Sequence, residues 1–213
     1  MAQRTLLIDS DAFLILAGTS LLRETLDLLE IKPTAARRLH ALPFMVERSA
    51  RIHDKYDLAT RQKALEACEQ VEGITERPSS ETLDLLASTS GIDEGEALLL
   101  GLACENEGAL VLTGDKKAII ALSGERRLNG LCERLKGRVI MVEPLLGRLV
   151  DRHGLVRVGD RIRLIRGANK ALDVLFSDAN CAKQDHFREA MKSYSNDFVQ
   201  KMNEEVLFIW TKE

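Results

Sequence analysis

The sequence predicts an α/β fold in which helices cover both faces of a central, mostly parallel sheet, giving three α/β/α layers. Short apolar runs typical of buried strands alternate along the chain with longer helical segments, and this alternation indicates a parallel sheet. Aromatic residues make up only 4% of the chain, which favours a helix-rich fold over an all-β one. A mainly helical extension is expected after this unit.

Three strands are expected, each from an apolar run that ends in a polar or turn-forming segment. Thr5 to Ile8 is the first run and is followed at once by Asp9. Ala109 to Leu112 is the second, and it leads into Thr113-Gly114-Asp115. Arg138 to Val142 is the third, and Pro144 then opens a helix, as proline does at first-turn positions.

Helical segments are expected between and after these strands, because apolar residues recur there at helical spacing. Gly18 predicts a loop or break in the first helix, and Pro43 predicts a kink or a boundary in the second. Residues 73–80, with Pro78-Ser79-Ser80, indicate a loop. The expected helices span residues 10–29, 35–56, 58–71, 81–87, 94–107, 116–122 and 126–136.

We place a domain boundary near residue 150, with the α/β domain over residues 1–150 and a helical extension over residues 151–213. Residues 155–165 fit either a hairpin or a helix, because apolar side chains alternate there around Gly159-Asp160. Residues 168–176 and 185–209 are expected to be helical. The last of these helices carries an apolar stripe, formed by Phe187, Met191, Tyr194, Phe198, Met202, Val206 and Ile209.

An amphipathic helix of this kind must bury its apolar face. We therefore expect the extension to pack on the first domain or to form a homodimer through its C-terminal helices. Arg157, Arg161, Arg163 and Arg166, like the earlier Arg37-Arg38 with His40, form either a nucleic-acid path or a solvated face.

Composition narrows the function classes. The net charge of −3 excludes a broad basic surface for long nucleic acids, but it leaves room for a small nuclease whose central acids bind metal ions. The four cysteines form no CxxC pair, so they are expected to be reduced thiols and not zinc ligands. No stretch of about 18 apolar residues and no signal-peptide pattern is present, so a cytoplasmic protein without a membrane span is expected.

Two acids occupy informative positions. Asp9 follows the first strand directly, and Asp115 follows the second expected strand by three residues. Because ligand sites of open parallel sheets lie outside the carboxyl ends of the strands, both acids can face one crevice. Glu96, on the helix before that second strand, is a third candidate. Carboxylates that converge in this way repel one another unless a divalent cation lies among them.

The segments LLIDSDAF (residues 6–13), DEGEALLLGLACENEGALVLTGDKKAI (93–119) and GRVIMVEPLL (137–146) resemble the PIN-domain nucleases. The resemblance covers residues 4 to 146 and is loose over 14–90. It implies a PIN-like fold and an Mg²⁺- or Mn²⁺-dependent nuclease that cleaves single-stranded RNA.

In this resemblance Asp9 matches the first-strand acid, Glu96 the helix acid and Asp115 the acid of a T-x-D motif that begins at Thr113. These three acids are the implied metal ligands and catalytic residues, and Glu47 matches a further catalytic acid. Lys116 and Lys117 stand where many relatives carry another acid, which points to phosphate contacts. The implied substrate-binding residues are Thr113, Ser10, Lys116 and Lys117.

Other interpretations remain open. Asp9, Asp11 and Asp115 also suit helix caps, and Asp93 and Glu94 suit acids of a helix first turn. A haloacid-dehalogenase-like phosphatase would use Asp9 as nucleophile and Asp11 as acid/base, although the second acid expected after Gly114-Asp115 is missing. A catalytically inert PIN-like scaffold that binds RNA or protein is a third alternative. Small PIN nucleases act as toxins, so a cognate antitoxin or another protein partner is also considered.

Overall fold

Five parallel strands form one sheet in the order β3-β2-β1-β4-β5 in a computed structural model that describes residues 4–200 and 204–208, with the side chains of 197–199 and 204 left aside. Each strand pairs in parallel with its neighbours. The strands are β1 (Thr5–Ile8), β2 (Ala36–Arg38), β3 (Glu72–Gly73), β4 (Ala109–Thr113) and β5 (Val139–Met141). The α/β class with a parallel sheet is confirmed.

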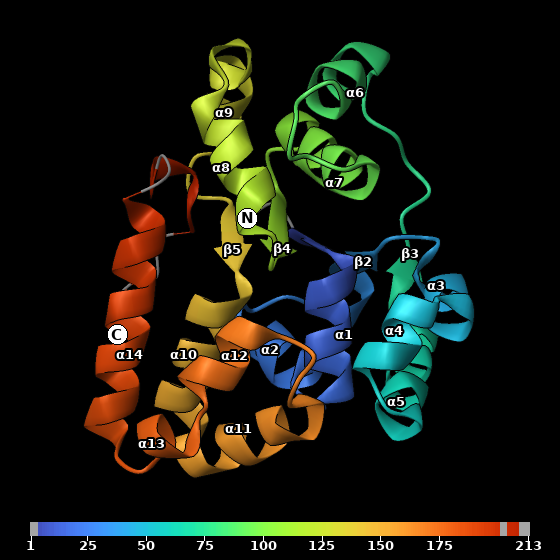
Figure 1. The fold of residues 1–213 in the computed structure, drawn as a ribbon. Coiled ribbons are helices and arrows are strands. Elements are labelled where there is room, and N and C mark those ends of the chain that lie inside the picture. The colour runs from blue at the N-terminus through green and yellow to red at the C-terminus, as the bar shows by residue number, and fades with distance from the viewer. Residues whose placement is uncertain (1–3, 201–203, 209–213) are drawn as a thin grey trace.

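The sheet separates two apolar cores, because successive strand residues point to opposite faces. Leu6 and Ile8 of β1 belong to one core, whereas Leu7 belongs to the other. Figure 1 shows α6 to α9 on one side of the strands, and α1, α2 and α10 to α14 on the other side. Helices therefore cover both faces of the sheet, as the alternation of strands and helices predicted.

The larger group of helices packs on the face of the sheet to which Leu6 and Ile8 of β1 point. They are α1 (Ser10–Gly18), α2 (Leu22–Leu28), α3 (Leu42–Arg48), α4 (Ala50–Lys55), α5 (Leu58–Gln70), α10 (Val142–His153), α11 (Leu155–Ile162), α12 (Lys170–Leu175) and α14 (Gln184–Val199), with the short α13 (Asp178–Cys181) beside them. The opposite face carries α6 (Ser80–Ala87), α7 (Glu94–Glu105), α8 (Lys116–Gly124) and α9 (Asn129–Leu135).

The expected break at Gly18 is confirmed, since α1 ends there and α2 begins at Leu22. A Cβ atom at position 18 would lie 2.4 Å from Cγ2 of Thr60 on α5. Glycine therefore allows α1 and α5 to approach closely.

The expected helix over residues 35–56 is wrong at its start, because residues 36–38 form β2. Ala36-Arg37-Arg38 has no strand-like composition, but its backbone pairs with β1 on one side and β3 on the other. Long-range pairing thus overrides local propensity here. Pro43 lies in the first turn of α3, so it marks a helix boundary, as one of the two alternatives predicted, and does not kink a longer helix.

The C-terminal extension is mainly helical in its described part and packs on the same core as α1. Residues 155–162 form α11, so the hairpin alternative is wrong. The α10 helix runs through residue 150 without interruption. Phe187 and Val206 are buried, and Met191 and Tyr194 pack against the core. The side chains of Phe198, Met202 and Ile209 lie outside the described residues.

A last segment returns to the sheet, which corrects the expected helix over residues 185–209. The α14 helix ends at Val199, and Leu207 forms a parallel bridge with Val139 at the edge of β5. The Gly137 N–H donates to the carbonyl of Glu205 at 2.7 Å, and the Phe208 N–H donates to that of Val139 at 2.8 Å. Backbone groups of β5 that would be exposed at a sheet edge are thereby paired.

Within the described residues, none of the helices combines the length and the apolar character needed to span a membrane.

Candidate functional site

The carboxyl ends of β1, β4 and β5 lie side by side and carry charged residues. In the register of the sheet, Ile8 pairs with Leu112 and Thr113 pairs with Met141. Asp9 therefore emerges level with the end of β4, and its backbone N–H donates to the carbonyl of Leu112 at 2.9 Å. Asp115 follows Thr113 by two residues. These positions put both acids at the edge where open parallel sheets bind ligands.

Glu96 reaches this region from the first turn of α7. Asp93 is the N-cap of that helix, and its carboxylate accepts from the Glu96 N–H at 2.8 Å. The Glu96 carboxylate accepts in return from the Asp93 N–H, also at 2.8 Å. This capping box fixes both side chains at the start of the helix. Asp93 uses Oδ1 and Glu96 uses Oε2 in this pair of bonds.

Asp115 is held by a similar local arrangement. Its backbone N–H donates to the hydroxyl oxygen of Thr113, which is buried at the end of β4. Its carboxylate accepts from the Ala118 N–H at 3.0 Å and so caps α8. The predicted capping role of Asp115 is therefore confirmed. Capping uses one carboxylate oxygen of Asp115, and the side chain also interacts with Glu96.

The pKa values of two acids show that the carboxylates interact. Burial and, to a smaller extent, the negative charges of Asp11 and Asp93 together raise the pKa of Asp9 to about 7. Burial also contributes most to the rise of the Glu96 pKa to about 8, to which Asp115 adds both by charge and by a side-chain hydrogen bond. Asp93 therefore interacts with both Asp9 and Glu96, and Glu96 interacts with Asp115. We call Asp9, Asp93, Glu96 and Asp115 the carboxylate cluster.

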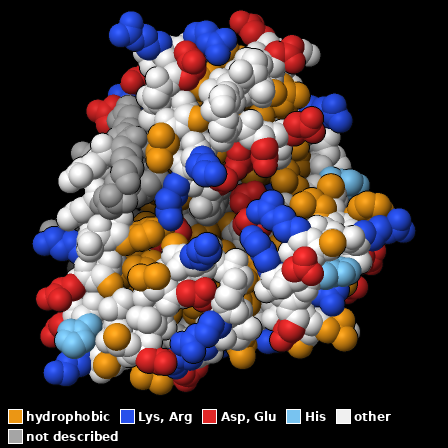
Figure 2. Space-filling model, in the orientation of Figure 1, with side chains coloured by type: hydrophobic (Ala, Val, Ile, Leu, Met, Phe, Trp, Pro, Cys, Tyr) orange, Lys and Arg blue, Asp and Glu red, His pale blue; other side chains and the backbone are white. Residues whose placement is uncertain are grey.

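Within the described part of the chain, no residue of the carboxylate cluster forms an ion pair with Lys, Arg or His. Figure 2 shows a hollow near the ends of β1 and β4, with Asp and Glu side chains at its centre and Lys and Arg side chains around it. Hard carboxylate oxygens and uncompensated negative charge are what Mg²⁺ and Mn²⁺ bind. Ser10, next to Asp9, also has a buried hydroxyl oxygen without a partner. The donor set thus fits a divalent cation.

The side chains do not already enclose such an ion. Among residues 4–200 and 204–208, no three Asp, Glu, His or Cys side chains are grouped closely enough to ligate one metal. Hydrogen bonds to the first turns of α7 and α8 hold Asp93, Glu96 and Asp115 in their present orientations.

Lys116 lies beside the cluster, but it is turned toward β5. Its ammonium is 3.2 Å from a carboxylate oxygen of Glu143, which follows β5 by two residues as Asp115 follows β4. It also lies 4.2 Å from the ring centroid of Tyr194 on α14. Lys117 is exposed and has no ion pair among the described residues. The two adjacent lysines therefore differ in how firmly they are held.

Glu47 lies on α3, in a groove that it forms with Val46 and residues of α5 such as Leu58 and Arg61. None of the main charge interactions of Asp9 or Glu96 involves it. Asp11 is half exposed and lies 3.8 Å from Arg51, on the outer side of the first turn of α1. Electrostatic interactions thus link Asp9 to Asp93, Asp93 to Glu96 and Glu96 to Asp115, whereas Glu47 lies elsewhere.

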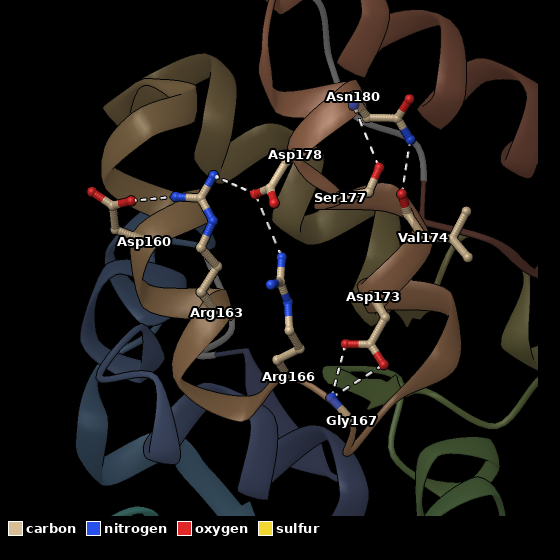
Figure 3. Close-up of polar contacts among 9 residues, drawn as sticks. All are labelled: Asp160, Arg163, Arg166, Gly167, Asp173, Val174, Ser177, Asp178 and Asn180. Atoms are coloured by element: carbon tan, nitrogen blue, oxygen red, sulfur yellow. Dashed lines mark hydrogen bonds and ion pairs between the residues drawn. The ribbon is translucent and has the colours of Figure 1, made fainter.

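The four arginines between residues 157 and 166 are paired with acids. Arg157 and Arg161 both contact Glu24 of α2. Figure 3 shows Arg163 between Asp160 and Asp178, with Arg166 directed at the same Asp178. These pairs connect helices of the extension to one another and to α2.

Three residues of this region were not predicted as site residues: Asp93, Glu143 and Tyr194. Asp93 was assigned to the helix dipole alone, although its position three residues before Glu96 is a capping-box signal that also fixes the direction of Glu96. Glu143 had a signal too, because it follows an expected strand as closely as Asp115 does. Tyr194 had none, since 51 residues separate it from Glu143.

Comparison of the chain with protein-family models, with curated proteins and with solved structures gave no match.

Proposed function

We propose that this protein is a metal-dependent nuclease of the PIN-like kind that hydrolyses phosphodiester bonds in single-stranded RNA. The observation that supports the proposal is the carboxylate cluster at the carboxyl ends of β1 and β4, whose charges interact in the series Asp9, Asp93, Glu96 and Asp115 without a cationic partner among the described residues. The resemblance of the segments around these three acids to PIN-domain nucleases supports the same reading. The RNA preference rests on that resemblance.

Asp9, Glu96 and Asp115 would hold Mg²⁺ or Mn²⁺, with Asp93 orienting Glu96 through the capping box. The ion supplies Lewis acidity, which activates water and stabilises the leaving oxygen of a phosphodiester. Thr113 fixes the main chain at Asp115, and Ser10 offers a hydroxyl group next to Asp9. The positive side chains around the hollow would attract the phosphate backbone.

The first test is thermal stability with Mn²⁺. An ion that binds only the folded chain stabilises it by about 2.7 kcal/mol at a hundred times its dissociation constant, so Tm should rise with Mn²⁺ concentration. Asp115→Asn should keep the fold but lose most of this rise and the cleavage of single-stranded RNA. Asp84→Asn, an equal swap at an exposed site on α6, is the matched control and should keep both.

A chain whose Tm ignores Mn²⁺ and that binds RNA without cutting it would be the inert scaffold. The phosphatase alternative makes a separate claim, namely that Asp11 acts on a phosphomonoester. Because Asp11 is half exposed and lies near Arg51, we expect Asp11→Asn to retain RNA cleavage. Hydrolysis of a small phosphomonoester that depends on Asp11 would replace the nuclease proposal.

A further inference from the structure

A buried network joins the start of α8 to the C-terminal extension. Glu143 is 1% exposed, and one of its carboxylate oxygens receives both the Lys116 ammonium at 3.2 Å and the hydroxyl group of Tyr194. The Tyr194 ring also lies against the Lys116 ammonium, 4.2 Å from centroid to nitrogen. Lys116 is thus held by a carboxylate and by an aromatic face at once, from α10 and α14.

Structural stability alone does not account for this network. A buried ion pair is a weak source of stability, because two charges lose their hydration. Burial raises the pKa of Glu143 even though Lys116 opposes that effect, and the second carboxylate oxygen of Glu143 is buried without a partner. The arrangement therefore keeps a costly carboxylate where an apolar residue would suffice, and what it achieves is a fixed position for the Lys116 ammonium.

That position is relevant to a phosphate. Lys116 directly follows Asp115 of the carboxylate cluster, and its side chain is 29% exposed. An ammonium group has three N–H donors. One is directed at Glu143 and a second faces the Tyr194 ring, which leaves the third for another acceptor. A fixed cation beside the proposed metal ligands is suited to bind an oxygen of the next phosphate along the RNA strand.

We propose that Glu143 and Tyr194 are positioning residues that hold Lys116 as a phosphate-binding cation beside the carboxylate cluster, so that helix α14 of the extension is part of the RNA site. The proposal rests on the proposed nuclease function for its substrate. It gives the C-terminal extension a role in binding as well as in packing.

The test measures binding of a short fluorescent oligouridine to the full-length chain in EDTA, over a range of salt concentrations. Each lost phosphate contact on a single strand lowers the slope of log K against log salt by about 0.7. Lys116→Met and Tyr194→Leu should each lower the slope by this amount and weaken binding several-fold. Lys32→Met should change neither value, because Lys32 is an exposed lysine just before the amino end of β2.

The deciding measurement is the double variant Lys116→Met/Tyr194→Leu. If Tyr194 acts through Lys116, the double variant binds no more weakly than Lys116→Met alone. Tyr194→Phe keeps the ring over the ammonium and should recover most of the loss seen with Tyr194→Leu. With Mn²⁺ present, the same variants should raise KM for RNA more than they lower kcat.

Lys116→Met leaves Glu143 buried without its cation, so Lys116→Met/Glu143→Gln serves as a second variant that should fold and still show the reduced slope. Additive losses, or an unchanged slope in the Lys116 variants, overturn the proposal and leave the nuclease function standing. Reduced slopes without any Mn²⁺-dependent cleavage overturn the nuclease function and keep the phosphate site. A wild-type chain that binds no RNA overturns both.

Discussion

At the scale of single residues, burial and neighbouring carboxylates both oppose the ionisation of the carboxyl groups of Asp9 and Glu96. Their pKa values of about 7 and about 8 lie above the ordinary values of 3.8 and 4.5. At pH values between the ordinary and the raised pKa, the folded state therefore binds more protons than the unfolded state. In that window the free energy of unfolding falls as pH rises. Without metal, the protein should therefore be most stable on the acidic side of this window.

We expect Asp9→Asn to flatten this pH dependence. In EDTA the variant should be more stable than wild type by roughly 1 to 3 kcal/mol at pH 8, because a raised pKa costs about 1.4 kcal/mol per unit. At pH 5 the difference should be small, since Asp9 is largely protonated there. Urea unfolding at both pH values measures this.

Asp84→Asn is again the matched control, and its unfolding curve should shift equally little at both pH values. Parallel curves for wild type and Asp9→Asn would show that Asp9 carries no excess charge repulsion. Saturating Mn²⁺ should reverse the trend in the wild type, because metal ligands must be deprotonated to bind.

At the scale of elements, the start of α7 combines two functions in Asp93, which caps the helix and adds charge to the cluster. Substitution of Asp93 by Asn and by Ala separates these two functions. Asp93→Asn keeps an N-cap oxygen, so we expect the metal-free protein to be as stable as wild type at pH 8 or more so. Asp93→Ala removes the cap and should cost about 1 kcal/mol.

Thermal unfolding in EDTA at pH 5 and pH 8 distinguishes the two effects. The loss in Asp93→Ala should be larger at pH 5, where relief of charge repulsion no longer offsets the missing cap. An Asn variant as unstable as the Ala variant at both pH values would show that the carboxylate itself is required to start α7.

At the scale of the whole molecule, the extension and the sheet share one apolar core. Phe187 of α14 is 2% exposed, and its ring packs at a tilt against that of Phe176, with 5.1 Å between the ring centroids. Val174, in the same extension, is 66% exposed. We expect Phe187→Ala to lower the free energy of unfolding by about 3 to 5 kcal/mol, and Val174→Ala to change it by less than about 0.5 kcal/mol.

Urea unfolding followed by circular dichroism should show one transition for both variants, because the extension has no separate core. Deletion of residues 155–213 should give an aggregating protein, since it uncovers buried faces of α10 and of the β5 edge. A deleted form that stays soluble, monomeric and equally stable would show that the extension contributes nothing to the core.

The sequence alone identified the strands at residues 5–8, 109–112 and 138–142, because their apolar runs are long enough to be buried on both faces. It also placed Asp9 and Asp115 at the carboxyl edge, since a residue that follows a parallel strand must emerge there. It did not reveal β2, whose Arg37 and Arg38 become a strand only through pairing with β1 and β3.

Only the tertiary structure decided which acids meet and what holds Lys116. The charge interaction of Asp9 with Asp93 and the hydrogen bond of Tyr194 to Glu143 join residues that are far apart along the chain. Local sequence patterns report on neighbours within a few residues, whereas such pairs depend on how whole helices pack against the sheet. The same reason explains why Leu207, expected in a helix, pairs with Val139: a free sheet edge satisfies its backbone better than a helix end would.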